Sequence, residues 1–129
     1  MSAASPGNFA NDDTLASMEY AVAVLNTPLI LVLGHDHCGA IDATIKSLHQ
    51  DKPPPGHISA LVTALAPAVN ASLGQAGDTS ARATRNNVID NVNKLRSTGP
   101  ILKAAVEQNR LKVVGALYRI DNGKVDIVS

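Results

Sequence analysis

The sequence predicts an α/β fold in which a small, mostly parallel sheet is flanked by helices. Two segments, residues 29–33 and 111–118, have the apolar and β-branched character of buried strands. Much of the remaining chain repeats apolar residues at helical spacing, largely between those two strands. A strand followed by helices and then by a second strand is typical of α/β proteins.

Composition excludes several classes of function. The chain has 129 residues, 45% of them hydrophobic, which suffices for one domain with a core. Its 11 basic and 11 acidic side chains give no net charge, and aromatic residues make up 2%, so neither nucleic acid nor a membrane is an expected partner. No apolar run reaches the roughly 20 residues that span a bilayer. A single cysteine and a start unlike a signal peptide predict a cytoplasmic protein.

The chain is expected to open with a flexible lead-in over residues 1–11, followed by a single domain over residues 12–129. Asn11 or Asp12 can cap the first helix. Its apolar stripe repeats every three or four residues: Leu15, Met18, Val22 and Leu25. Residues 29–33 are apolar without alternation, which predicts a parallel strand buried on both faces.

Helices are predicted over most of the middle of the chain. One begins at Gly39 and ends before a rigid proline linker, residues 51–56. The next begins at His57, and Pro67 is expected to kink it or end it early. Apolar residues at helical spacing support these two helices: Ile41, Ile45, Leu48, Ile58, Leu61, Val62, Leu65 and Val69.

The last third of the chain is predicted to return to the sheet. Residues 80–97 form a polar helix with a narrow apolar seam, and residues 101–107 form a short helix. Asn122-Gly123 suits a tight hairpin between the strand of residues 111–118 and an antiparallel edge strand over residues 124–128. The seam of the polar helix consists of Val88, Val92 and Leu95.

His35 and Cys38 are the candidate metal ligands. They follow the first strand at the point where it turns into a helix, and glycines at positions 34 and 39 allow a tight turn there. Imidazole nitrogen and thiolate sulfur are ligands that zinc prefers. In open α/β sheets, ligands bind beyond the carboxyl ends of the strands. Taken alone, the His-x-x-Cys pattern also fits a buried structural cysteine beside a hydrogen-bonded histidine.

Other chemistry-bearing residues are weaker candidates. His37 points differently from His35 if the segment is still extended there, because side chains alternate along a strand. His49 and His57 flank the proline linker, where solvated histidines are expected. Asp42 lies one turn past Cys38 and either hydrogen-bonds a ligand or is simply solvated. No glycine-rich phosphate loop or serine nucleophile motif is present.

Residues 15–40 resemble the β-class carbonic anhydrases. In that family a Ser-x-Glu-Tyr-Ala helix precedes an apolar strand that ends in Gly-His-x-x-Cys-Gly, and both motifs are present here at residues 17–21 and 34–39. Gly7-Asn8 is similar to the end of the family's Arg-x-Ala-Gly-Asn segment. Residues 112–118 and the turn that follows are similar to the family's final strands. The resemblance therefore covers nearly the whole chain and implies a three-layer fold.

The resemblance implies a zinc site for the reversible hydration of carbon dioxide to bicarbonate and a proton. His35 and Cys38 match the second and third zinc ligands of the family. The family's Cys-x-Asp-x-Arg motif, which supplies the first ligand and an Asp–Arg dyad, has no counterpart in this sequence. We therefore expect Zn²⁺ to be bound weakly or in part, and hydration to be impaired in this chain alone.

The resemblance also implies a domain that is truncated at its N-terminus, with a reduced sheet. One of the family's strands without a counterpart here lies centrally, beside the strand that bears His35. We expect the backbone edge of residues 29–33 to be exposed and a homo-oligomer to cover it. A partner chain or second copy that donates the missing first ligand is a further hypothesis. The alternative function is a catalytically inactive remnant that binds metal weakly or serves as an assembly module.

Overall fold

The sheet contains three strands in the order β1-β2-β3, with a parallel and an antiparallel pairing. β1 (Leu29–His35) pairs in parallel with β2 (Lys112–Tyr118), with Leu29 opposite Lys112 and His35 opposite Tyr118. β2 then pairs antiparallel with the short strand β3 (Val125–Ile127). The computed structural model describes residues 1–129. Its helices are α1 (Asp12–Ala23), α2 (Gly39–Gln50), α3 (Ile58–Asn70), α4 (Thr79–Ser97) and α5 (Ile101–Glu107).

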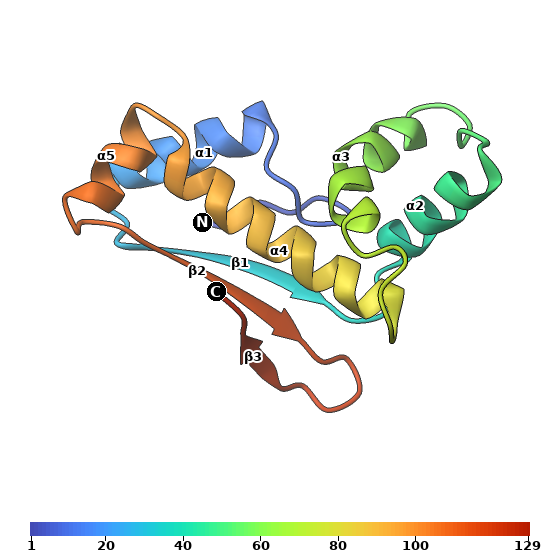
Figure 1. Cartoon of the computed structure of the whole chain (residues 1–129). Coiled ribbons are helices and arrows are strands. Elements are labelled where there is room, and N and C mark those ends of the chain that lie inside the picture. The colour runs from blue at the N-terminus through green and yellow to red at the C-terminus, as the bar shows by residue number, and fades with distance from the viewer.

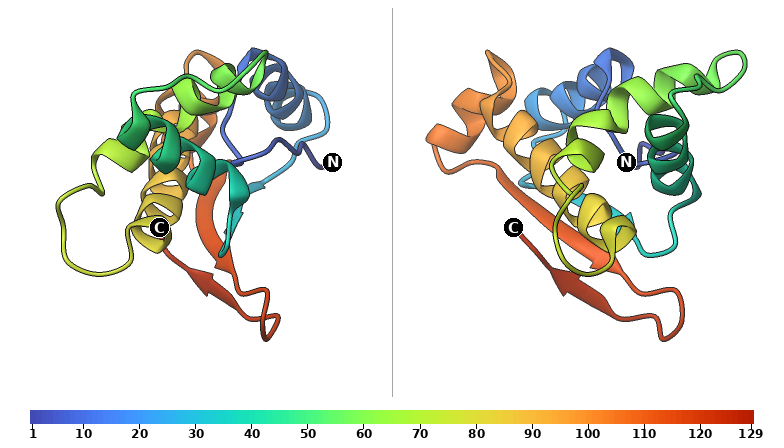
Figure 2. Two further views of the ribbon diagram at one scale, coloured as in Figure 1. Left: turned by 90° about the vertical axis from the view of Figure 1, so that its right-hand side faces the viewer. Right: turned by 45° about the vertical axis from the view of Figure 1, so that its right-hand side comes forward.

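All five helices lie on the same side of the sheet (Figure 1). α4 crosses β1 and β2, with α1 and α5 gathered at one of its ends and α2 and α3 at the other (Figures 1 and 2). The predicted seam of α4 is fully buried at Val88, Val92 and Leu95, where it meets the inward side chains of both strands. A second apolar cluster lies between α2, α3 and α4 and includes Cys38.

The opposite face of the sheet is uncovered, so the molecule has two layers rather than the expected three. Burial alternates strictly along β1, and side chains at odd positions are exposed. Leu29, Leu31 and Leu33 are 51%, 49% and 43% exposed, so the prediction of a strand buried on both faces is wrong. Val114, which is opposite Leu31, and three exposed residues further along β2 and on β3 extend this apolar face: Tyr118, Val125 and Ile127.

β1 lies at an edge of the sheet, as predicted. The Lys112 N–H donates to Pro28 O, and the Asp36 N–H donates to Tyr118 O. The backbone N–H and C=O groups of even-numbered residues of β1 therefore point toward β2. Those of odd-numbered residues point toward the open edge of the sheet. A groove of about 460 Å³ follows this edge, between β1, α1 and the first residues of the chain.

The segment before α1 is packed where a flexible lead-in was expected. Gly7 and Ala10 are buried, and the Ala10 N–H donates to Asn91 Oδ1 on α4 at 2.8 Å. Asn87 and Asn91 are buried polar residues one turn apart on α4, and the segment supplies the backbone groups that pair with them, Gly7 O and the Ala10 N–H. Residues 1–4 are exposed.

Two local predictions need adjustment, and one capping prediction holds. Asn11 caps α1 and forms a reciprocal pair of hydrogen bonds with Thr14. Pro67 lies inside α3, which continues to Asn70, so the proline does not end the helix early. The final hairpin is wider than a two-residue turn, since its loop closes between Arg119 and Lys124. No helix in the structure combines the length and apolar character that crossing a membrane requires.

Candidate metal site

His35 is the last residue of β1 and is exposed, with one ring nitrogen already engaged. Its Nδ1 lies 2.7 Å from the carbonyl oxygen of Asp36. A carbonyl oxygen only accepts hydrogen bonds, so Nδ1 carries the proton in this contact. In the neutral ring, Nε2 then keeps its lone pair free for a metal, an arrangement that is common among metal-bound histidines.

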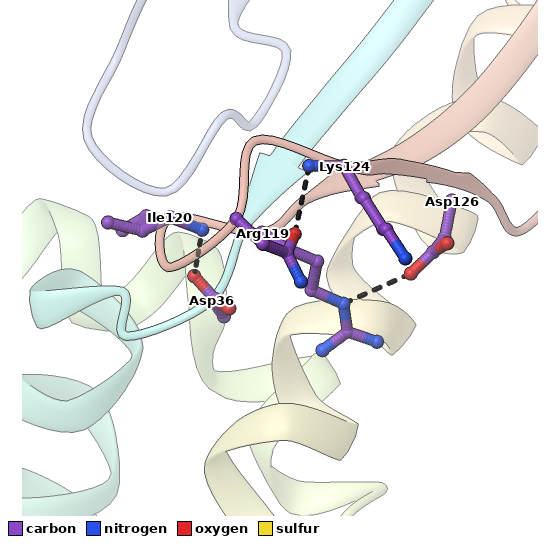
Figure 3. A network of polar contacts seen from close by, with 6 residues as sticks. Asp36, Arg119, Ile120, Lys124 and Asp126 are labelled. Carbon is purple, nitrogen blue, oxygen red and sulfur yellow. Dashed lines mark hydrogen bonds and ion pairs between the residues drawn. The ribbon is translucent and has the colours of Figure 1, made fainter.

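The bend between His35 and Cys38 is tied to the hairpin that follows β2 (Figure 3). The Asp36 carboxylate accepts a hydrogen bond from the Ile120 N–H at 3.0 Å, and the Asp36 N–H donates to Tyr118 O. Beside them, Arg119 forms an ion pair with Asp126 at 3.0 Å. His37 completes the bend with a positive φ of 52°, so the chain is no longer extended there. The hairpin thus holds the bend that connects the two candidate ligands.

Cys38 sits at the N-terminal end of α2 and is 6% exposed. It belongs to the apolar cluster formed by Ile41, Leu65, Val69 and Ala83. It also lines a pocket of about 260 Å³ together with His35. The structure therefore brings the two predicted ligands to one pocket, on either side of the bend.

The weaker candidates do not join this pocket. His37, His49 and His57 are exposed and do not line it. Asp42 is also exposed, and its carboxylate accepts a hydrogen bond from the Ser80 hydroxyl at 2.6 Å, which ties α2 to α4. No three His, Cys, Asp or Glu side chains gather anywhere in a way that could hold a metal ion.

The donor set fits zinc in kind but not in number. One imidazole nitrogen and one thiolate sulfur are typical zinc ligands. Zinc sites in proteins usually contain three or four protein ligands, and this pocket offers two residues of the required types. Any tightly held metal would need at least one further donor.

Sequence reasoning missed the asparagines that adjoin this pocket. Asn8 and Asn87 both line it, and their side chains are hydrogen-bonded to each other at 3.0 Å. Asn87 lies on a helix whose polar composition alone predicts an exposed position for it. The signal that could have found the pair is its neighbourhood: Asn87 precedes the apolar seam, and Asn8 belongs to the Gly-Asn segment that resembles the family.

A model of the carbonic anhydrase family matches residues 3–125 of this sequence. The chain belongs to the β-carbonic anhydrase family. Its similarity to carbonic anhydrase 2 of Mycobacterium tuberculosis is 33% identity over 120 residues, which cover 92% of this chain.

Solved β-carbonic anhydrases share the fold. The enzyme CcaA superposes with a TM-score of 0.78 over 96% of this chain, at 26% identity. A tetrameric β-carbonic anhydrase of Sordaria macrospora superposes with a TM-score of 0.75 over 97% of the chain, at 23% identity. The chain spans only 57% of the length of the M. tuberculosis relative and 63% of CcaA, so it corresponds to part of such a protein.

Proposed function

We propose that this chain is a β-carbonic anhydrase-type zinc protein whose His35 and Cys38 supply two ligands of a site for reversible carbon dioxide hydration. The single observation that carries the proposal is the shared pocket, which Cys38 lines together with a histidine whose Nδ1 is engaged and whose Nε2 is free. Membership of the family supplies the reaction.

Each residue has a definite task in this proposal. Cys38 anchors the metal from the start of α2, and His35 approaches it from the end of β1. The Asp36 carbonyl keeps the proton on Nδ1 of His35, so that the ring presents Nε2. Zinc, when bound, lowers the pKa of a coordinated water to about 7 and so supplies a nucleophile at neutral pH.

The proposed activity of this chain alone is low. Two protein ligands hold zinc less firmly than three, and nothing in the pocket takes the part of the family's Asp–Arg dyad, since no aspartate, glutamate or arginine lines it. We expect zinc to be bound weakly and hydration of carbon dioxide to stay near the uncatalysed rate until another chain supplies a third donor.

Zinc titration of purified protein tests the ligand assignment. His35→Ala and Cys38→Ser should each weaken zinc binding by more than the about 10–100-fold that loss of a supporting hydrogen bond costs. His35 is exposed, so its replacement leaves the core intact, and His49→Ala serves as the control because His49 is exposed and lies outside the pocket. Unchanged zinc affinity in both ligand variants would contradict the assignment.

Stopped-flow hydration of carbon dioxide then separates an enzyme from a catalytically inactive remnant. With zinc supplied, we expect rates close to the buffer background for the chain alone. If the rate instead rises well above background and the Cys38→Ser variant abolishes it, the chain completes its own site. A background rate together with no measurable zinc binding would favour the alternative function of an assembly module.

We further propose that the protein is a homo-oligomer, as expected from its open edge. Support comes from the free backbone groups of β1, the apolar outer face of the sheet, and the tetrameric state of the related Sordaria macrospora protein. Covering this surface with a second copy would remove exposed leucines from water and pair the edge.

A further inference from the structure

The first residues of the chain form half of the wall around the pocket that His35 and Cys38 line. Six of the twelve residues that line it belong to the stretch of residues 3–8. The other six come from β1, from α4 and from the start of α2. Residues 3–8 are thus the one part of the wall that is neither strand nor helix, nor next to one.

The stretch that begins at Gly7 is firmly attached to the helices. Gly7 O accepts a hydrogen bond from Asn87 Nδ2, and Ala10 O accepts one from Lys94 Nζ at 2.6 Å. Gly7 is buried and lies against Leu65, which belongs to the apolar cluster between α2, α3 and α4. The residues before Gly7, residues 1–6, form a strap that leaves this fixed root.

A tight turn sets the direction in which the strap leaves its root. The Asn8 N–H donates to Ser5 O at 3.0 Å, which closes a turn with Pro6 and Gly7 at its centre. Gly7 has a φ of 79°, the value that a type II turn requires at its third residue, where glycine is preferred after proline. Figure 1 shows the start of the chain running toward α2 and α3 and then turning back to α1.

The strap itself is held by few contacts. Residues 1–4 are exposed, and no hydrogen bond joins them to any other part of the chain. The hydrogen bond from the Ser5 hydroxyl to Phe9 O stays close to the turn. Ala3 and Ser5 line both this pocket and the groove along β1, so the strap lies between two hollows. A segment with so few buried contacts opens at a free-energy cost well below that of global unfolding.

The two candidate ligands differ in how far they are enclosed. His35 is exposed, whereas Cys38 is 6% exposed and shares its pocket with the strap. The rest of the pocket wall belongs to secondary structure, whose displacement would break a helix or the sheet. Movement of the strap is therefore the least costly way to open this pocket toward Cys38.

We propose that the strap is a movable cover of the metal pocket, and that its swing about the Pro6–Gly7 turn admits zinc to the thiol of Cys38. The inference rests on the proposed function, because it describes how the metal reaches that site. The closed strap leaves His35 open to solvent and encloses Cys38. Zinc can therefore meet His35 first, and it meets Cys38 only after the strap has opened.

Alkylation by iodoacetamide tests the strap without any metal, because Cys38 is the single cysteine of the chain. Deletion of residues 2–5 should raise the alkylation rate of metal-free protein about tenfold or more, since the thiol loses its cover. The wild-type rate should depend little on urea below the unfolding transition, because opening of the strap exposes little surface. A rate that rises steeply with urea would instead show that global unfolding exposes Cys38, and would refute the inference.

Gly7→Ala is a second variant, which keeps every residue of the strap. A Cβ on Gly7 would lie 2.8 Å from Leu65 Cδ1, and a φ of 79° strains alanine. The closed strap should therefore be disfavoured and alkylation should be about tenfold faster. Gly74→Ala is the matched control, since Gly74 has a similar φ of 72°, a Cβ there meets nothing within 4 Å, and Gly74 does not line the pocket. Equal alkylation rates in these two variants would contradict the inference.

A wild-type alkylation rate in the deletion variant would overturn the inference, because the pocket would then stay closed without the strap. That outcome leaves the proposed function intact, since zinc affinity is measured separately through His35 and Cys38. If the deletion speeds alkylation but zinc does not bind, the strap stands and the metal assignment falls.

The rate of zinc association provides the last comparison. Where zinc binds, stopped-flow mixing should show association about tenfold faster in the deletion variant than in the wild type, because the cover no longer has to move. Unchanged association would mean that zinc reaches Cys38 by another route, and the strap would not be the cover proposed.

Discussion

Gly34 and Gly115 face the same valine of α4 from two neighbouring strands. A Cβ on Gly34 would lie 2.6 Å from Val88 Cγ2, and a Cβ on Gly115 would lie 2.8 Å from Val88 Cγ1. Contacts this short do not occur between real side chains, so α4 would have to move away from the sheet. The two glycines are therefore needed for the closeness of helix and sheet, rather than for backbone freedom.

At the residue scale, Gly115→Ala should lower the free energy of unfolding by about 1–3 kcal/mol, since it inserts a methyl group into a packed core. Urea denaturation followed by circular dichroism measures the change. Gly39→Ala is the control, because a Cβ there meets nothing within 4 Å and alanine favours the helix that begins at Gly39. Equal stability of the two variants would show that α4 can shift without cost.

The local part of the candidate site was predictable from sequence at this scale. His35 and Cys38 are three residues apart at a strand-to-helix turn, so short-range geometry alone brings them to one pocket. The contact of Asn8 with Asn87 was not predictable in this way. Seventy-nine positions separate the two residues, and no periodicity or spacing rule reports on a contact between a loop and a buried face of a polar helix.

At the scale of elements, the hairpin after β2 positions the bend that carries the candidate ligands. The Asp36 carboxylate accepts the Ile120 N–H, and this contact links the end of β1 to the loop between β2 and β3 (Figure 3). The position of that loop was not foreseen, because the turn signal at Asn122-Gly123 says nothing about a contact with Asp36, which lies 84 positions before Ile120. The contact itself became visible only in the structure.

Removal of the hydrogen bond between Asp36 and Ile120 should disturb the candidate metal site. We expect Asp36→Ala to weaken zinc binding by about tenfold, in the range seen when groups that orient metal ligands are lost. The Ile120 amide should also exchange faster with deuterated water. Asp36→Asn keeps an oxygen acceptor and should bind zinc like the wild type. Wild-type affinity in Asp36→Ala would mean that the helix α2 alone holds the bend in place.

The elements themselves followed closely from apolar periodicity and capping, whereas their environment did not. The stripe Val88, Val92 and Leu95 is buried as its spacing requires, and Asn11 caps α1. The strand of residues 29–33 was expected to be buried on both sides because every residue in it is apolar. An apolar sequence predicts only that burial of its side chains is favourable. It does not predict which part of this molecule, or of another molecule, covers them.

At the scale of the whole molecule, the uncovered sheet face and the open edge of β1 predict self-association. Light scattering at tens of micromolar should give a mass of at least two chains. Leu31→Lys places a charge in the middle of the exposed face and should shift the mass toward one chain, because burying an unpaired charge is costly. Leu31 lies outside the buried core, so the fold should persist.

Gln50→Lys is the control for this measurement, since it adds the same charge at an exposed site at the end of α2, away from the sheet. A monomeric wild type at this concentration would contradict the proposal. Equal masses for wild type and Leu31→Lys would contradict the proposed contact, because they would show that the outer face of β1 is not part of it.

The notch formed by Gly34 and Gly115 has a consequence for remote substitutions. Val88 packs into this notch, and its contact with both strands opposes sliding of α4 along the sheet. Asn87 is the residue before Val88 on that helix. The position of α4 in turn places Asn87, which lines the same pocket as Cys38. A methyl group added at Gly34 or Gly115 would therefore change the shape of the pocket, although none of the residues that line it had been replaced.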